Sequence, residues 1–307
     1  MPIRAKLYLL LGAGAAGLLL LAGAGEALSR PATHAIGPAP AELHARDVVL
    51  PLAAPGSGEG AGGAGVQHVA GWFIAGAPGA GAVLLLHGVR GDRSAMLARA
   101  RFLRRAGYAV LLLDLPSHGA SSGERITFGW REAAGVAAAM AFLRRELPGE
   151  KIGVIGVSLG AAALMFSGER PDAAVLESMY PTITEAVSDR LRARLGPLGG
   201  AAAPLLLWQL PIRLGLSPAQ LAPIDRIAAF KAPLLIASGS EDLHTTAAET
   251  RRIYAAAPEP KQLWMVPGAA HVDLHGYGTA EYERIVLAIL ARHLRGASPA
   301  PAGAAGT

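Results

Sequence analysis

The chain contains no cysteine among its 307 residues. Disulfides, thiolate nucleophiles and cysteine-based metal sites are therefore excluded, and the redox compartment is left undetermined. Aromatic residues are scarce at 5%, so the core must be built largely from Leu, Val and Ile. The net charge of +5 is spread along the chain without a long basic run or a cluster of basic and aromatic residues. We therefore predict no nucleic-acid partner.

Charge is also missing from the N-terminal stretch "LYLLLGAGAAGLLLLAGAG", residues 7–25, which follows Arg4 and Lys6. As a helix this stretch would extend roughly 28 Å, close to the thickness of about 30 Å of a bilayer's hydrocarbon core. Basic residues before such a run stay cytoplasmic, which sends the rest of the chain across the membrane. Residues 1–26 are therefore either a retained signal anchor or a signal peptide cleaved near Ala22 and Ala24. Both interpretations predict an extracytoplasmic main domain.

The rest of the chain divides into a long central domain and short low-complexity segments. Residues 27–45 are expected to form a linker, residues 55–65 a flexible loop, and residues 297–307 a disordered tail. Between the linker and the tail, residues 46–296 are predicted to form one α/β domain.

Within this domain, short apolar runs alternate with helical patterns. Strands are expected at 48–52, 68–74, 82–86, 109–115, 151–157, 173–178, 233–238 and 262–266, and helices at 94–106, 131–147, from 158, 245–256 and 280–294. Continuous apolar strands that alternate with helices predict a mostly parallel eight-stranded sheet with helices on both faces. The Leu-, Ala- and Pro-rich stretch 181–231 interrupts this alternation, and we expect it to form a short helical cap.

The sequence "GVSLG", residues 156–160, fits the pattern G-x-S-x-G at a junction between a strand and a helix. In that context a serine occupies a strained turn that projects its hydroxyl from the edge of the sheet. Glycines two residues before and after it avoid a steric clash. Ser158 is therefore the candidate nucleophile, the alternative being a simple turn.

A serine nucleophile needs a base and a carboxylate to orient that base, in the chain order Ser, acid, His. His271 lies in a Gly/Ala-rich loop directly after the last strand and is the preferred base, with His275 as the alternative. Asp242, in "SGSEDLHTT", is the preferred acid. Its alternatives are Glu241 and Glu177, and a helix cap would also explain an acidic residue at 241 or 242.

Two backbone N–H groups are expected to form an oxyanion hole. One is the N–H of Val89, the first residue after His87–Gly88, and the other is the N–H of Leu159, at the start of the helix. We interpret His87, and His118 in "DLPSHGASSG", as structural residues.

Together these motifs resemble, in order and spacing, those of α/β-hydrolase fold serine hydrolases over residues 46–296. The sequence is most similar to the branch of serine-aminopeptidase-like and acylglycerol-lipase-like proteins, some of which are membrane-anchored. The resemblance implies a triad of Ser158, Asp242 and His271, with Val89 and Leu159 as oxyanion donors. Arg90 stands where the family usually has another polar residue, and the cap is short, so substrate preference is not carried over.

These observations predict a serine hydrolase that cleaves an ester, thioester or amide of a small-molecule acyl substrate, with an ester as the preferred substrate class. The mechanism needs no metal and no cofactor. Leu205–Leu207, Trp208 and Leu210 in the cap either favour apolar substrates or only pack the cap. An acyltransferase and a non-catalytic, membrane-tethered binding protein are the alternatives.

Overall fold

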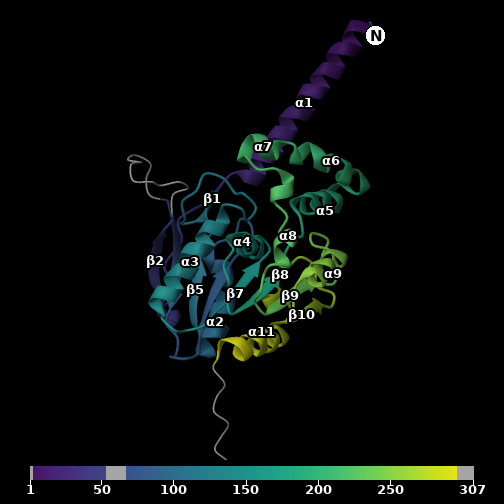
Figure 1. Ribbon diagram of the computed structural model, residues 1–307. Coiled ribbons are helices and arrows are strands. Elements are labelled where there is room, and N and C mark those ends of the chain that lie inside the picture. The colour runs from purple at the N-terminus through teal and green to yellow at the C-terminus, as the bar shows by residue number, and fades with distance from the viewer. Residues whose placement is uncertain (1–2, 53–66, 296–307) are drawn as a thin grey trace, which may run out of the picture.

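The computed structural model describes residues 3–52 and 67–295 (Figure 1). Its centre is an eight-stranded sheet in the order β10-β9-β8-β7-β4-β5-β3-β2. The strands are β2 (Arg46–Pro51), β3 (His68–Ile74), β4 (Ala82–Leu86), β5 (Ala109–Leu113), β7 (Ile152–Val157), β8 (Ala173–Glu177), β9 (Leu234–Gly239) and β10 (Lys261–Val266). Only the pairings of β3 with β2 and β5 are antiparallel. This confirms the predicted mostly parallel sheet, while the loop at 55–65 and the tail at 297–307 lie outside the described residues.

The burial of the strands explains their composition. All residues of β4, β5, β8 and β9 are buried, because helices cover both faces of the sheet. Such strands carry continuous apolar runs instead of alternating patterns. The edge strand β2 instead alternates buried and exposed residues along much of its length, as expected where one face meets solvent.

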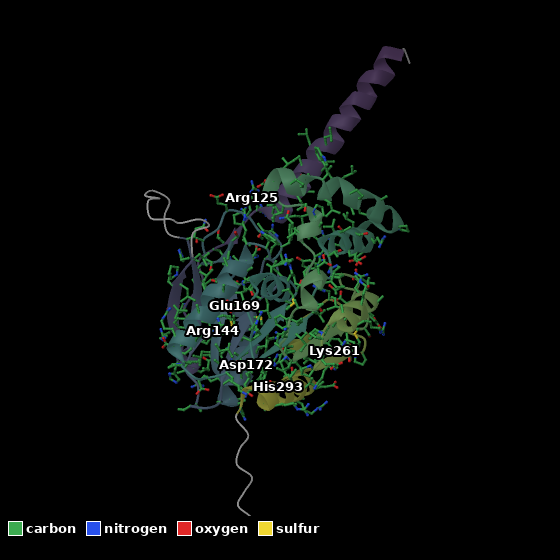
Figure 2. All side chains as sticks on the ribbon, viewed as in Figure 1. Arg125, Arg144, Glu169, Asp172, Lys261 and His293 are labelled. Atoms are coloured by element: carbon green, nitrogen blue, oxygen red, sulfur yellow. The ribbon has the colours of Figure 1, made fainter. Side chains whose placement is uncertain are left out.

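Two layers of helices enclose the sheet. The helices α3 (Glu132–Glu146), α4 (Leu159–Ser167) and α9 (Ala247–Ala256) pack on one face, while α2 (Leu97–Arg105) and α11 (Thr279–Leu294) pack on the other. Helix α2 starts later than predicted, because residues 93–96 form a 3₁₀ turn in which the side chain of Asp92 accepts from the N–H of Ser94. Figure 2 shows Arg144 on α3 beside Glu169 after α4, and their 2.8 Å ion pair joins the two helices.

The chain between β8 and β9 is helical, as predicted for the cap. It contains α5 (Ile183–Leu195), α6 (Pro197–Leu207), α7 (Gln209–Leu214), the 3₁₀ turn Pro218–Gln220 and α8 (Ile224–Ile227). Gly196 separates α5 from α6 with a positive φ of 67°, and Pro197 begins α6. The cap packs on the sheet domain through a cluster that includes Tyr180 and Ala162 of α4.

The N-terminal segment forms helix α1 (Ile3–Ser29), which projects from the domain beside α7 (Figure 1). Among the residues that the structure describes, none of the helices combines the length and the apolar character needed to span a bilayer. The membrane anchor expected at residues 7–25 therefore stays a prediction.

Residues 27–45, expected to be a linker, pack against the domain over several contacts. The short strand β1 (Ala32–Thr33) pairs with β6 (His118–Gly119), and the 3₁₀ turn Ala41–Leu43 places Leu43 in the core at 1% exposure. These contacts attach the end of α1 to the α/β domain.

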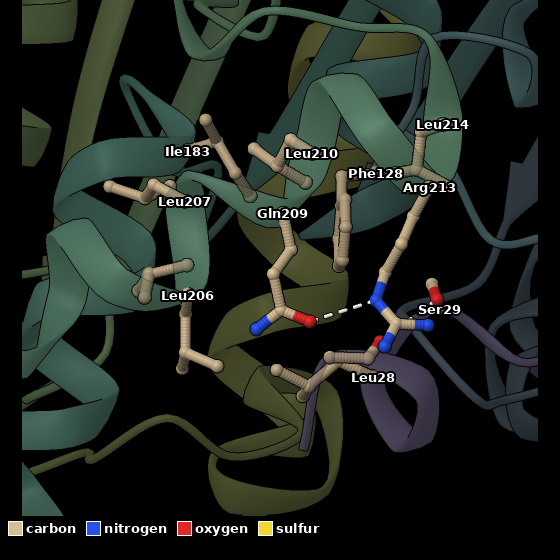
Figure 3. A pocket seen from close by; sticks show the side chains of 12 residues that line it. Leu28, Ser29, Phe128, Ile183, Leu206, Leu207, Gln209, Leu210, Arg213 and Leu214 are labelled. Carbon is tan, nitrogen blue, oxygen red and sulfur yellow. Dashed lines mark hydrogen bonds between the residues drawn. The ribbon is translucent and has the colours of Figure 1, made fainter. Parts of the chain in front are cut away.

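The last turns of α1 also contact the cap directly. Gln209 Nε2 donates to the carbonyl oxygen of Leu21 at 2.9 Å, and Arg213 Nε donates to Gln209 Oε1 at 2.8 Å (Figure 3). Leu28, Phe128 and other side chains around these groups line a small, mostly apolar pocket between α1 and the cap.

Candidate active site

Ser158 lies in the turn between β7 and α4. Its backbone has φ 48° and ψ −101°, a strained conformation for a residue with a side chain. The turn is fixed by its backbone, because the N–H of Ser158 donates to the carbonyl oxygen of Glu177 at 2.8 Å. Ser158 is 5% exposed. The strand, turn and helix predicted around this serine are therefore present, and the first turn of α4 follows it directly.

The two glycines of the motif are required by close packing. A Cβ atom on Gly156 would lie 2.7 Å from the backbone nitrogen of Ala161, and one on Gly160 would lie 2.5 Å from the carbonyl oxygen of Leu86. Both contacts are with backbone atoms, which cannot move aside as a flexible side chain can. Glycine is therefore the residue type that lets α4 approach both its own strand and the end of β4.

Asp242 and His271 meet at the same edge of the sheet, although 29 residues separate them. Asp242 follows β9 and His271 follows β10, and these strands are parallel neighbours, so the segments after them leave the sheet side by side. His271 Nδ1 and Asp242 Oδ2 are 2.7 Å apart. This is the contact by which a carboxylate holds one tautomer of an imidazole.

The surroundings of Asp242 keep its carboxyl group ionised. Asp242 is 2% exposed, and its Oδ1 accepts from the backbone N–H groups of His244 at 2.8 Å and Thr245 at 2.9 Å. Burial raises its pKa, but the hydrogen bond and charge of His271 together with the two N–H groups outweigh burial and lower the pKa. The same two N–H bonds fix which carboxylate oxygen faces the histidine.

The alternative acids have other positions. Glu241 is exposed at the surface. Glu177 is buried at the end of β8, where its carboxylate contacts Arg99 and Tyr282. Of the three acids considered, Asp242 is the one that contacts His271.

The alternative base His275 has another partner, and the two other histidines that follow Ser158 differ in their distance from the site. His275 Nε2 is 3.1 Å from Glu283 Oε1, and its ring stacks on Phe102. His293 lies on α11, at the opposite end of the molecule from Arg125 (Figure 2). The ring of His244, in contrast, lies 5.0 Å from that of His271, so this histidine borders the candidate site.

One contact of the expected triad is not formed. Within the described part of the chain, Ser158 Oγ makes no hydrogen bond to the ring of His271. In ligand-free enzymes the catalytic hydrogen bonds are often long and tighten only when substrate binds. The structure thus joins the acid to the base and places the serine in its strained turn.

The loop after β4 lies beside the serine. A Cβ atom on Gly88 would be 3.9 Å from Ser158 Cβ, so the next residue, Val89, is at the site. The buried His87 stabilises this loop, because its Nε2 accepts from the N–H of Leu115 at 3.1 Å and its Nδ1 lies 2.7 Å from the carbonyl oxygen of Gly88. Burial lowers the pKa of His87 to about 4, so the ring is neutral at pH 7.

Leu159 begins α4, so its N–H is one of the free donors at the N-terminus of that helix. Leu159 follows Ser158 in the chain, and Val89 follows Gly88, which lies beside Ser158. Among the residues that the structure describes, no three His, Asp or Glu side chains are grouped so as to hold a metal ion.

Comparison with known proteins agrees with this architecture. The model of the alpha/beta hydrolase family matches residues 83–289. The chain belongs to the alpha/beta hydrolase family. It is 34% identical over 213 residues to the uncharacterized protein Rv2307c of Mycobacterium tuberculosis, covering 67% of this chain and 69% of that protein. The uncharacterized protein YqkD of Bacillus subtilis is 23% identical over 210 residues, covering 66% of this chain and 69% of that protein.

Solved structures of esterases share the fold. The esterase Pf2001 of Pyrococcus furiosus superposes with a TM-score of 0.69 at 21% identity, covering 86% of this chain and 98% of the esterase. A thermophilic esterase of Thermogutta terrifontis superposes with a TM-score of 0.56 at 18% identity, covering 81% of this chain and 99% of the esterase. At such identities the likeness establishes the fold alone.

The apolar residues of the cap of this hydrolase have two different roles. Leu207 and Leu210 are buried in the cap's own cluster, so they hold its helices together. Leu205 and Trp208 are 56% and 68% exposed, so their side chains face outward. The pocket in Figure 3 lies between α1 and the cap, and neither Ser158 nor His271 lines it.

Sequence reasoning did not single out Arg99. This arginine on α2 is buried beneath the site and contacts Glu177 and Asp273. Charged residues spaced along a helix such as α2 predict a solvent-exposed face. The burial of Arg99 is therefore seen in the tertiary structure and is not predicted by the pattern.

Proposed function

We propose that this alpha/beta hydrolase cleaves an ester bond through an acyl-enzyme formed on Ser158. The observation that supports the proposal most directly is the 2.7 Å contact between Asp242 Oδ2 and His271 Nδ1 at the sheet edge where Ser158 occupies its strained turn. An imidazole oriented by a carboxylate at the edge of the sheet that carries the serine is the arrangement that activates an alcohol. The fold of esterases such as Pf2001 is consistent with this chemistry.

In the proposed mechanism, Ser158 Oγ attacks the carbonyl carbon while His271 Nε2 accepts the hydroxyl proton. Asp242 holds the other ring nitrogen and stabilises the imidazolium that forms. The N–H groups of Val89 and Leu159 donate to the oxyanion. His271 then gives its proton to the leaving alcohol, and a water molecule, activated by the same ring, hydrolyses the acyl-enzyme.

A fluorophosphonate probe tests the nucleophile. We expect the full-length protein to be labelled, and labelling to be lost in Ser158→Ala and in His271→Ala. Ser167→Ala is a matched control, because Ser167 lies at the other end of α4, where its hydroxyl donates to the carbonyl oxygen of Leu164 at 2.7 Å, and this variant should keep labelling. A folded wild type that is not labelled would exclude the acyl-enzyme mechanism and favour a binding protein on this fold.

The substrate class is tested by p-nitrophenyl esters of increasing acyl chain length, with the matching thioester and anilide at the preferred length. We expect turnover of the esters above the anilide, because the sequence marks no acidic site for the amine of a peptide. A large excess of transfer to an added alcohol over hydrolysis would identify an acyltransferase instead.

We further propose that α1 is retained and anchors the domain on the extracytoplasmic side of a membrane. Support comes from the hydrogen bond of Gln209 to the carbonyl oxygen of Leu21 and from that of Arg213 to the carbonyl oxygen of Ala22 at 2.6 Å. Cleavage near Ala22 or Ala24 would remove these contacts. Carbonate extraction and intact mass of the expressed protein test this proposal, and a soluble product that lacks residues 1–24 would contradict it.

A further inference from the structure

A buried arginine connects the two halves of the proposed catalytic machinery. Arg99 on α2 is 2% exposed, and a buried guanidinium needs partners for its charge and its N–H groups. Its Nη2 lies 2.6 Å from Glu177 Oε2 and 2.7 Å from Asp273 Oδ1. Its Nε donates to the hydroxyl oxygen of Tyr282 at 2.9 Å, and that hydroxyl in turn donates to Glu177 Oε1 at 2.5 Å.

The Glu177 side of this network lies under the nucleophile. Glu177 ends β8 and is paired in register with Val157, the residue before Ser158. Its carbonyl oxygen accepts the N–H of Ser158 at 2.8 Å. The carboxylate of Glu177, 1% exposed, therefore ties the guanidinium of Arg99 to the rigid strand end that supports the serine.

The Asp273 side of the network lies in the loop of the base. Asp273 is two residues after His271, and its side chain is 52% exposed. Besides contacting Arg99, it accepts from the N–H of Gly276 at 3.2 Å and so caps α10 (Leu274–Tyr277). A single carboxylate thus fixes the loop to the buried cation on one side and to the following helix on the other.

We propose that Arg99 is a positioning residue, which fixes the His271 loop through Asp273 in a position from which the ring can approach Ser158 Oγ when substrate binds. The inference rests on the proposed function. The inference follows from two contacts of Arg99. One is with Glu177, whose carbonyl oxygen accepts the N–H of Ser158, and the other is with Asp273 in the loop of His271. In the proposed mechanism His271 must reach Ser158 Oγ, so a change in the position of its loop changes that contact, and a displacement of about 1 Å can lower a rate about 100-fold.

Asp273→Asn is the main test, because asparagine keeps the helix cap but loses the charge that pairs with Arg99. We expect kcat on a p-nitrophenyl ester to fall about 10- to 100-fold with KM changed less than about twofold. The rate of fluorophosphonate labelling should fall in parallel. Asp273→Glu restores the carboxylate and should recover part of the loss. Arg99→Lys keeps the charge without the planar fork and should give an intermediate kcat.

Arg101→Met is the matched control. It removes an arginine from the same helix that pairs with Glu42 at 2.9 Å on the surface, and should leave kcat unchanged. Activity is expressed per site titrated by the probe, so that a loss of folded protein does not count as slower catalysis. Wild-type kcat per site in Asp273→Asn and Arg99→Lys, beside an inactive Ser158→Ala, would overturn this inference alone. Full activity in Ser158→Ala would overturn the proposed function itself.

Discussion

Replacing Asp242 with asparagine tests the proposed triad at its best-defined contact. In the structure Asp242 Oδ1 accepts two backbone N–H groups, from His244 and Thr245, while Oδ2 faces His271 Nδ1. In Asp242→Asn the amide oxygen must keep the position facing the two N–H donors, because an NH₂ group there would meet other donors. The NH₂ group then points at His271 Nδ1 and donates to it. The ring is thereby forced into the tautomer with its proton on Nε2.

That tautomer cannot accept the proton of Ser158. We expect kcat at neutral pH to fall about 10³- to 10⁴-fold, which corresponds to roughly 4–5.5 kcal/mol of transition-state stabilisation. Ester hydrolysis and the rate of fluorophosphonate labelling should fall together, with KM little changed. Because the two backbone N–H bonds persist, the variant should remain folded, with a loss of about 1–3 kcal/mol in the free energy of unfolding.

Glu241→Gln is the matched control for this experiment. Glu241 precedes Asp242 in the same turn but is exposed, so its amide should leave kcat within about twofold of wild type. A folded Asp242→Asn enzyme that keeps more than a tenth of the wild-type kcat would refute the proposed role of Asp242. A large loss of kcat in Glu241→Gln would indicate that Glu241, and not Asp242, is the acid of the triad.

Three further predictions concern packing and pH. Gly160→Ala brings a Cβ to 2.5 Å from a carbonyl oxygen of β4, so kcat should fall at least about 100-fold and the free energy of unfolding by about 1–3 kcal/mol. Gly37→Ala is the control, because Gly37 has open space around it, and it should leave both quantities unchanged. Burial and then a neighbouring carboxyl group raise the pKa of Glu249 from 4.5 to about 7. The unfolded state therefore loses this proton at lower pH than the folded state, so stability should fall between about pH 4.5 and pH 7, and urea unfolding of Glu249→Gln should give a flatter profile over that range. Burial lowers the pKa of His87 and His118 to about 4, so the unfolded state takes up more protons below pH 6.5 and stability should be lost toward pH 4. His118→Asn should reduce that loss in urea titrations, and an unchanged acid profile would contradict this explanation.

The local features of the site could be predicted because short-range sterics and burial dictate them. The strands lie within two residues of their predicted ranges, since a strand buried on both faces must be continuously apolar. The turn at Ser158 could be predicted from the spacing of Gly156 and Gly160, because a side chain at either position would clash with backbone atoms. Those atoms belong to the first turn of α4 for Gly156 and to the end of β4 for Gly160. The helical segment between β8 and β9 was likewise indicated by the break in alternation.

The choice among neighbouring polar residues depended on the tertiary structure. Glu241 and Asp242 are adjacent in sequence, yet one is exposed and the other is buried against His271. The attachment of residues 27–45 to the domain through β1 was also invisible in their polar, proline-containing composition. A side chain's direction depends on the final register of its loop, which a local pattern does not encode.

The amino-acid sequence predicts the succession of the main strands and helices along the chain, the sharp turn that presents a serine, and the polar loops that follow the last two strands. The contact between Asp242 and His271, the docking of the end of α1, and the burial of Arg99 between Glu177 and Asp273 are seen in the folded structure alone. The physical reason is the separation along the chain of the residues that interact. Backbone strain and strand burial act between near neighbours in the chain, whereas ion pairs and hydrogen bonds between loops exist only after distant strands have paired.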